Sequence, residues 1–233
     1  MAAFANDAME IEPVAHIKTQ FSTKFGVPRQ SGIVSSLKAT IVFEPKYRTA
    51  DALRGIEGFS HLWLVWGFSH NRRSDGSWTP LVRPPRLGGN AKVGVFACRS
   101  PFRPNNLGLS AVALEGVEET QEHGTVLHVS GADLVDGTPI YDIKPYIPFT
   151  DSIAGAVGGF ANEAPVALKV ECPQELLRLL GDDAQALVDV LACDPRPAFH
   201  DDPTRVYGME FAGHEVKFTV NEDTVTVVSV EKA

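Results

Sequence analysis

The stretch Leu109–Val117 (LSAVALEGV), with Thr125–Ser130 (TVLHVS) after it, decides the fold class of this 233-residue chain. Both segments are rich in aliphatic and β-branched residues, which favour strands. Three more segments of the same kind are Ile33–Phe43, His61–Phe68 and Lys92–Cys98. Turn residues separate them. Several short strands with Gly/Pro turns predict a mainly β protein, either a sandwich or a barrel.

The last third of the chain is expected to be a smaller α+β domain. Pro173–Leu180 predicts a helix that ends at Gly181, and a second helix is expected after Asp182. The weakly patterned segment 154–164 (AGAVGGFANEA) has the character of a linker, so we expect domains at 11–152 and 163–233. The expected strands of the second domain are Val166–Glu171, Arg205–Phe211, Glu215–Val220 and Thr224–Val230.

Composition excludes several classes of protein. Apolar residues make up 44% and charged residues 21% of the chain, which is typical of a globular protein and not of a disordered one. Cys98, Cys172 and Cys193 form no CxxC pair, so we expect no zinc site and no disulfide framework, and a cytoplasmic location. The longest strongly apolar run, Leu62–Phe68, is far shorter than the roughly 18 residues of a membrane span.

Motifs for the common cofactor folds are missing from the sequence. It contains no GxGxxG fingerprint, no P-loop and no GxSxG elbow. His61 and His70 lie near one predicted strand without an obvious third ligand, so we expect no metal. A cofactor would therefore have to bind outside these folds.

Positive charge is concentrated in one part of the chain. The net charge of −8 divides into +1 for residues 1–149 and −9 for residues 150–233. Between Arg72 and Arg103 lie six arginines and one lysine against one acid, interleaved with Pro, Gly and Phe. Arginine binds phosphate and carboxylate groups through two parallel hydrogen bonds, so this stretch favours local anion binding. A solvated basic face is the alternative.

Loops that combine Pro and Gly with polar side chains recur along the chain. Such loops can be rigid without regular hydrogen bonding, and sites are commonly built on them. The segments are 25–32 (FGVPRQSG), 83–90 (RPPRLGGN), 99–108 (RSPFRPNNLG), 133–146 (DLVDGTPIYDIKPY) and 193–199 (CDPRPAF).

In order and spacing these five segments resemble the TsaA-like family, from about Ile11 to Phe218. The resemblance implies an antiparallel β-barrel catalytic domain, followed by a C-terminal domain found in the tRNA enzymes of the family. It implies methylation by S-adenosylmethionine of N6 of threonylcarbamoyladenosine at position 37, next to the anticodon of threonine tRNA. It also implies a homodimer.

The resemblance assigns site residues motif by motif. The residues that would bind the cofactor are Pro28, Arg29, Gln30, Ser69, His70, Arg99, Leu109, Asp133, Leu134, Val135, Asp136, Gly137 and Thr138. Stacking rings and cationic groups suit an anticodon loop. The residues expected to bind that loop are Arg86, Phe102, Arg103, Lys144, Tyr146 and Arg196.

The chemistry asks for positioning and for a proton acceptor. The sulfonium donor is already activated, and the carbamoyl group makes the N6 proton more acidic, so a carboxylate suffices as the base. Asp133 and Asp194 are the candidate catalytic residues, and Asp136 is expected to bind the methyl donor. Asp136 could instead accept backbone N–H bonds within its own turn. Residues after about 160 are expected to be dispensable for cofactor binding.

Two other functions stay open from the residues alone. One is a non-catalytic module that binds S-adenosylmethionine or RNA. The other is a methyltransferase of the same family that acts on a small molecule. The acidic C-terminal part favours both, since it does not attract RNA unaided.

Overall fold

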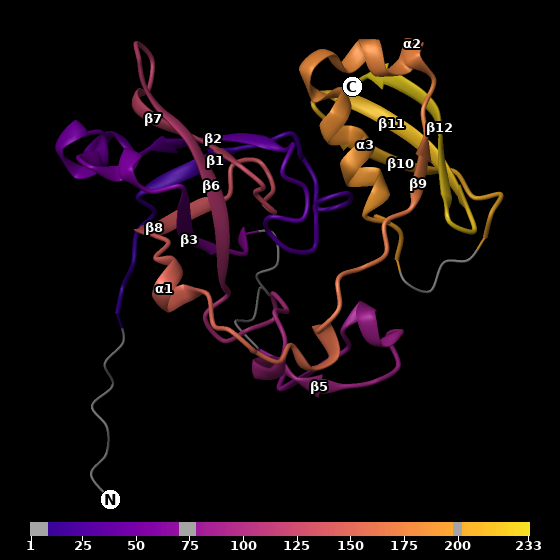
Figure 1. Cartoon of the computed structure of the whole chain (residues 1–233), viewed down its shortest axis with the longest axis horizontal. Coiled ribbons are helices and arrows are strands. Elements are labelled where there is room, and N and C mark those ends of the chain that lie inside the picture. Colours follow the sequence, from indigo (N-terminus) through magenta and orange to yellow (C-terminus); the bar gives the residue numbers. More distant parts are fainter. Residues whose placement is uncertain (1–8, 70–77, 198–201) are drawn as a thin grey trace, which may run out of the picture.

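Two antiparallel-rich sheets make up most of the computed structural model, which describes residues 9–69, 78–197 and 202–233 (Figure 1). The mainly β class predicted from the sequence is confirmed. The strands are β1 (Ala15–Lys18), β2 (Lys38–Phe43), β3 (His61–Gly67), β4 (Leu81–Val82), β5 (Val93–Gly94), β6 (Leu107–Thr120), β7 (Gly124–Ser130), β8 (Pro139–Pro145), β9 (Lys169–Glu171), β10 (Tyr207–Phe211), β11 (His214–Asn221) and β12 (Thr224–Lys232).

Helices are short and lie mainly in the connections. The α-helices are α1 (Pro148–Asp151), α2 (Gln174–Leu177) and α3 (Ala184–Ala192). The 3-10 turns include η1 (Pro45–Tyr47), η2 (Ala50–Leu53), η3 (Ile56–Gly58), η5 (Pro85–Leu87), η6 (Val95–Ala97), η7 (Gly159–Ala161) and η8 (Arg178–Asp183). No helix among the described residues is long and apolar enough to cross a membrane.

The larger sheet pairs in the order β1-β2-β7-β6-β3-β8, and β8 pairs with β1 again, so the ladder closes into a barrel. Every pairing in this ring is antiparallel. Side chains alternate across a strand, so one face of each strand fills the interior. Ile17, Ile41, Leu64 and Ile140 lie there fully buried.

The smaller sheet has the order β10-β11-β12-β9, with β9 parallel to β12. The buried face of α3 packs on this sheet through Leu187 and Leu191. The hydrophobic core of this second unit is not made by the C-terminal part alone. It also takes in Phe21, Val34 and Leu37 from the loop between β1 and β2.

Because of this shared core, the second unit includes residues from the first of the two domains expected from the sequence. Residues 21–37 leave the barrel after β1, enter the second core and return to form β2. The segment 28–30, which the resemblance assigns to the cofactor, lies between two of these buried anchors. The second unit therefore helps to fix the position of a predicted cofactor loop.

Some predicted strands differ from the observed ones. Strand structure within 33–43 begins only at Lys38, because Val34 and Leu37 turn into the other core. The expected strand 92–98 is a two-residue β5 followed by η6. β8 was missed because Pro139 and Pro145 stand at its ends, and proline within a run argues against a strand.

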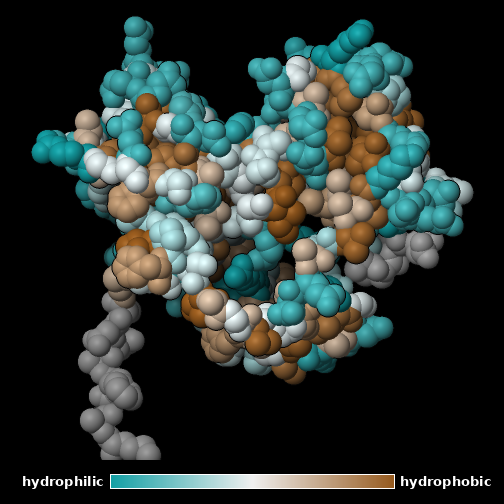
Figure 2. Space-filling view, in the orientation of Figure 1, coloured by the Kyte–Doolittle hydropathy of each residue, from teal (hydrophilic) through white to brown (hydrophobic). Residues whose placement is uncertain are grey.

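Residues 78–103, which include β4 and β5, form a small lobe that lies below the barrel in Figure 1. Its turn η5 packs against η7 in the exposed connection, and Arg86 donates a hydrogen bond to the carbonyl oxygen of Glu163. Figure 2 shows the face hollowed between the barrel, the second unit and this lobe.

Candidate functional site

Two glycine turns bring distant loops together beyond the end of β7. Gly32 N–H donates to the Gly131 carbonyl oxygen at 2.8 Å, and Gly131 N–H donates to Leu37 at 2.9 Å. Gly131 has φ +77°, and a Cβ there would lie 3.3 Å from the Cα atom of Gly32. Only glycine allows both this backbone conformation and this approach. The 25–32 loop therefore lies directly against the loop that carries Asp133.

A chain of hydrogen bonds runs to Asp133 from inside the barrel. The indole Nε1 of Trp66 donates to Ser110 Oγ at 2.9 Å, and Ser110 Oγ donates to Asp133 Oδ1 at 2.6 Å. Burial raises the pKa of Asp133, since desolvation disfavours its charged form. The bond from Ser110 and the nearby charge of Arg99 lower the pKa by less.

Arg99 bonds to the 25–32 loop, and its charge lies near Asp133. Its Nη1 donates a hydrogen bond to Gln30 Oε1, and the Gln30 amide donates to the Arg29 carbonyl oxygen. Backbone contact from Ser31 also lowers the pKa of Asp133. We name Gln30, Arg99, Ser110, Asp133 and Trp66 the Asp133 cluster.

Leu109 lies next to this cluster in sequence, and its side chain is 55% exposed on β6. The structure thus brings three predicted cofactor residues, Gln30, Arg99 and Asp133, into one network, with an exposed apolar side chain beside Ser110. Pro28 is buried in the same loop, and Ser69 is exposed after β3. His70, the other member of the predicted pair, lies outside the described residues.

The C-terminal part reaches this network through Arg29. Its Nη2 donates to the carbonyl oxygen of Arg196 at 3.1 Å. The Arg196 side chain pairs with Asp194, with Nε to Oδ1 at 2.8 Å and Nη2 to Oδ2 at 2.9 Å. Both oxygens of Asp194 therefore accept hydrogen bonds from the Arg196 guanidinium. The assignment of Asp194 as a base stays a prediction.

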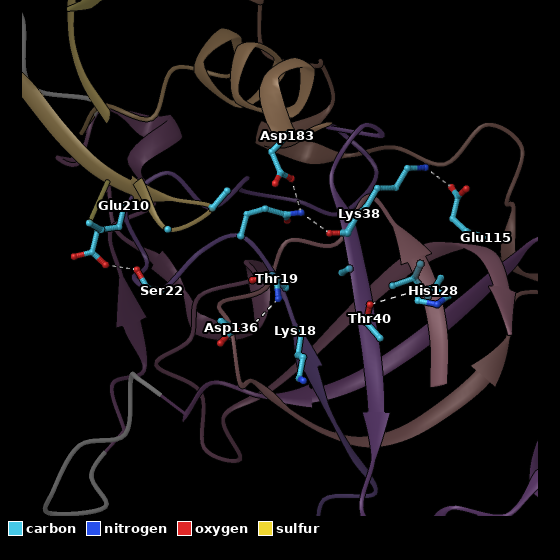
Figure 3. A pocket seen from close by; sticks show the side chains of 16 residues that line it. Lys18, Thr19, Ser22, Lys38, Thr40, Glu115, His128, Asp136, Asp183 and Glu210 are labelled. Carbon is cyan, nitrogen blue, oxygen red and sulfur yellow. Dashed lines mark hydrogen bonds and ion pairs between the residues drawn. The ribbon is translucent and has the colours of Figure 1, made fainter. Parts of the chain in front are cut away.

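Asp136 lies three residues after Asp133 in a different environment. Its Oδ1 accepts the backbone N–H of Thr19 at 2.9 Å, and its own N–H donates to the Phe21 carbonyl oxygen at 2.7 Å. Figure 3 shows the Asp136 side chain turned to Thr19. Asp136 thus has a backbone role, but its partner Thr19 belongs to the segment after β1 and not to the turn of Asp136 itself, as the sequence-based alternative had it.

The rest of that turn is also internally bonded. Gly137 takes φ +73°, and Thr138 Oγ1 donates to the Val135 carbonyl oxygen at 2.7 Å. The side chains of Leu134 and Thr138 are buried. A cofactor contact from this turn would therefore come from its backbone.

Asp136 lines a groove of 730 Å³ between β1, β2 and β7 of the barrel and the second unit (Figure 3). The polar side chains of the groove pair with one another: Gln20 with Asp183, Lys38 with Glu115, and Ser22 with Glu210. We place the site at the Asp133 cluster and not in this groove, because a buried carboxyl with a raised pKa beside an arginine is the stronger mark of chemistry.

The residues predicted to bind RNA do not form one group in the structure. Arg103 Nη1 donates to the carbonyl oxygens of Cys98 and Val95, at 2.7 and 3.3 Å, and so holds its own loop. Lys144 pairs with Asp142 on β8. Tyr146 packs on Trp63, with ring centroids 5.4 Å apart.

Phe102 is 39% exposed on the loop that follows Arg99. Within the described ranges, no group of three His, Cys, Asp or Glu side chains is placed to hold a metal ion.

Sequence reasoning missed Trp66 and Ser110. Ser110 is fully buried at an inward-facing position of the apolar strand β6, between exposed Leu109 and half-buried Ala111. A polar residue at a core position needs a hydrogen-bond partner and is a signal in itself. The partner, Trp66, is on the neighbouring strand β3 and could not be paired with it without the register.

Family comparisons cover both parts of the chain. Residues 16–152 match the model for the tRNA-methyltransferase O (TrmO) N-terminal domain, and residues 162–233 match the TrmO C-terminal domain. The chain belongs to the TrmO family.

The Escherichia coli (strain K12) TrmO relative, named tRNA (adenine(37)-N6)-methyltransferase, is 39% identical over 234 residues, covering 96% of this chain and 98% of that protein. A relative from Pseudomonas aeruginosa whose name describes an S-adenosylmethionine-dependent methyltransferase is 39% identical over 208 residues, 85% of this chain and 87% of its own. A crystal structure of TrmO from the same organism superposes with TM-score 0.80 at 32% identity, over 99% of this chain and 100% of that one.

Proposed function

We propose that this chain is an S-adenosylmethionine-dependent enzyme that methylates N6 of threonylcarbamoyladenosine at position 37 of threonine tRNA. Membership of the TrmO family and the names of its relatives support tRNA adenine-N6 methylation with this cofactor. The observation on which the assignment of the site rests is the half-buried Asp133 carboxyl, which accepts a hydrogen bond from Ser110 and lies near the charge of Arg99, itself bonded to the 25–32 loop.

The side chains of the site fit the methyl donor. That donor carries a carboxylate, an ammonium group, ribose hydroxyls and an adenine ring. Arg29 and Arg99 offer guanidinium groups for the carboxylate, Gln30 offers an amide, and exposed Leu109 offers an apolar surface for the ring. When bound, the donor supplies an activated methyl group.

In this proposal Asp133 is the proton acceptor. N6 of the adenine would form a bond to the methyl carbon as the bond between that carbon and the sulfonium sulfur breaks and leaves a neutral thioether, and the N6 proton would pass to the Asp133 carboxylate. The raised pKa of Asp133 favours this role, because a more basic carboxylate takes the proton more readily. Burial of Asp133 beside Ser110 keeps water from competing for the carboxylate.

Recognition of the tRNA is assigned to exposed groups of the lobe next to Asp133. Phe102 offers a ring for stacking, and Arg86 lies in the turn η5 of the same lobe. The threonyl carboxylate of the modified base needs a cation near the site, which the lobe arginines can supply. We also propose Lys144, Tyr146 and Arg196 as later contacts along the RNA.

The decisive experiment is mass spectrometry of nucleosides from threonine tRNA after incubation with enzyme and S-adenosylmethionine. The proposal predicts a gain of one methyl group on threonylcarbamoyladenosine. It predicts no product with the same tRNA made without the threonylcarbamoyl group. Equal methylation of both tRNAs would reject the substrate assignment, and no methylation of either would reject the function.

We further propose that the enzyme is a homodimer in the cytoplasm, where its tRNA substrate lies. Large apolar side chains are exposed on the lobe and on the connection after β8: Trp78, Leu81, Phe96, Phe149, Ile153 and Val157. Apolar surface of this kind is commonly covered in an assembly. Sedimentation at micromolar concentration should give twice the chain mass, and a monomer mass would reject the dimer.

The aromatic side chains of β3, for which the sequence allows either a core or a partner surface, have their contacts within this chain. Trp66 is buried in the barrel, Phe68 packs against it, and Trp63 donates a hydrogen bond to Asp151.

A further inference from the structure

While Asp133 is ionised, the hydrogen bonds behind it have one direction, because a carboxylate can only accept. An indole Nε1–H is a donor and never an acceptor. Ser110 Oγ, 2.9 Å from the Trp66 nitrogen, must therefore accept that hydrogen. Its single hydroxyl hydrogen is left for Asp133 Oδ1 at 2.6 Å. Oδ1 of the Asp133 carboxylate, the state that can take up a proton, is thus a hydrogen-bond acceptor.

This direction distinguishes the two oxygens of the carboxyl group. An oxygen that accepts a short bond from Ser110 is a poor place for a proton, because an added proton would compete for the same side of the atom. A proton taken up by Asp133 belongs on Oδ2.

We infer that Ser110 and Trp66 are positioning residues of the methylation site, which fix Asp133 so that Oδ2 is the oxygen that receives the N6 proton. The inference rests on the proposed role of Asp133 as the base. Neither Ser110 nor Trp66 touches the substrate in this account. They act through the orientation of the carboxyl group and through its affinity for a proton.

Packing holds the hydrogen-bonded chain from Trp66 through Ser110 to Asp133, which we call the relay, in one arrangement. Ser110 is 0% exposed and Trp66 is 8% exposed, so water cannot replace either partner easily. Trp66 pairs with Gly108 across the strands, and a Cβ on Gly108 would lie 2.3 Å from the indole ring. Glycine at that position is what allows the indole to lie against β6 with its Nε1 at Ser110.

The surroundings of Asp133 contain few other groups that could set its protonation. Among the described residues, the charged group that acts on its pKa is Arg99 from the lobe, and Ser110 and Ser31 contribute hydrogen bonds from β6 and the 25–32 loop. Among the contributions that lower the pKa of Asp133, the hydrogen bond from Ser110 is the largest. Its removal should therefore be visible in the titration of Asp133.

The test measures the ionisation of Asp133 by ¹³C NMR of protein labelled at the aspartate and glutamate carboxyl carbons, without cofactor or RNA. The Asp133 signal is assigned by its loss in Asp133→Asn. We expect Ser110→Ala to move the titration of Asp133 to higher pH, since a hydrogen bond that favours the carboxylate is lost. Ser110→Thr, which keeps the hydroxyl, should restore it.

The matched control is Ser130→Ala. Ser130 is also a buried serine of the barrel, and its Oγ donates to a different carboxylate, Glu115. This variant should move the titration of Glu115 to higher pH and leave that of Asp133 unchanged, because the bond from Ser130 is the main cause that lowers the pKa of Glu115.

A second variant keeps the inference testable if Ser110→Ala does not fold. Trp66→Phe removes the donor to Ser110 and weakens the polarised chain, so it should shift Asp133 in the same direction by less. The pH–rate profile of turnover should follow: its acidic limb should move to higher pH in both variants, with about tenfold lower turnover at pH 6.

An unchanged Asp133 titration in Ser110→Ala and Trp66→Phe would overturn the inference, and so would a shift to lower pH. Failure of the proposed function would give a result that can be told apart from failure of this inference. In that case the wild-type chain would not methylate tRNA, whereas the NMR titration, which needs no substrate, would still report on the relay.

Discussion

Asp133 and Asp136 occupy the same loop, three residues apart, and the structure uses them in opposite ways. Asp133 is half-buried, desolvation raises its pKa, its side-chain hydrogen-bond partner is Ser110, and the charge of Arg99 lies nearby. Asp136 is exposed, and it holds the backbone N–H of Thr19. Desolvation of the Asp133 carboxyl group costs stability, whereas the Asp136 carboxyl group links two backbone segments by a hydrogen bond.

The contrast teaches how to separate a site residue from a structural one. A carboxylate that accepts a backbone N–H favours the fold in a direct way. A buried carboxyl group whose charge is only partly compensated does not, so its presence is better explained by chemistry.

Removal of the second unit should have the largest effect, because the Asp136 side of the loop depends on it. Asp136 bonds to Phe21, and Phe21, Val34 and Leu37 are buried in the second core. A chain that ends at Gly159 would expose all three, at about 1.5–3 kcal/mol each. That sum is comparable to the whole stability of a typical domain.

We therefore expect the shortened chain to lack a cooperative thermal transition and to bind no S-adenosylmethionine. This replaces the sequence-based expectation that residues after about 160 are dispensable for cofactor binding. A soluble shortened chain that binds the cofactor with the affinity of the full chain would restore the earlier expectation.

On the Asp133 side, Arg99→Ala should weaken cofactor binding by about 10- to 100-fold, which corresponds to the roughly 1.5–3 kcal/mol of hydrogen bonds to charged groups. The variant removes the bond to Gln30 and the charge near Asp133. Calorimetric titration with S-adenosylmethionine measures the change. Arg48→Ala, which removes an arginine that bonds to Phe43 on the barrel, is the control and should bind normally.

Asp136→Ala should lower the free energy of unfolding by about 1 kcal/mol, because the Thr19 N–H loses its acceptor. Denaturant unfolding gives this value. Asp136→Asn keeps an acceptor oxygen and should lose less. A larger loss in Asp136→Asn than in Asp136→Ala would contradict the backbone role of Asp136.

The smallest effect is a pH-dependent gain in stability for Asp133→Asn. A carboxyl group with a raised pKa in the folded state stabilises the fold below its unfolded pKa, and this contribution is lost as the pH rises through its folded pKa. The melting temperature of the variant relative to wild type should therefore rise between pH 4 and pH 8. We expect a gain below the roughly 2–4 °C that 1 kcal/mol gives a chain of this size.

The sequence was informative about both the fold class and the loops of the site. Strands β3, β6 and β7 follow from their alternation, and Gln30, Arg99 and Asp133 were singled out in loops rich in Pro and Gly. Their convergence was not predictable in detail, since it depends on the close approach of Gly32 to Gly131.

Two features could not be obtained from the sequence at all. The burial of Phe21, Val34 and Leu37 in the second core depends on tertiary packing between segments far apart in the chain. The relay from Trp66 depends on the register of β3 against β6. Spacing alone likewise gives Asp133 and Asp136 equal standing, and only their three-dimensional surroundings separate them.

The central claim is that Asp133 accepts the proton and Asp136 does not. The most direct test measures turnover on threonine tRNA that carries threonylcarbamoyladenosine, with saturating S-adenosylmethionine, for Asp133→Asn and Asp136→Asn side by side. Cofactor affinity is measured on the same preparations. Asp133→Asn should lose about 10²- to 10⁴-fold in turnover with its cofactor affinity within about threefold of wild type, and Asp136→Asn should turn over normally. Normal turnover in Asp133→Asn, with collapse in Asp136→Asn, would contradict the account.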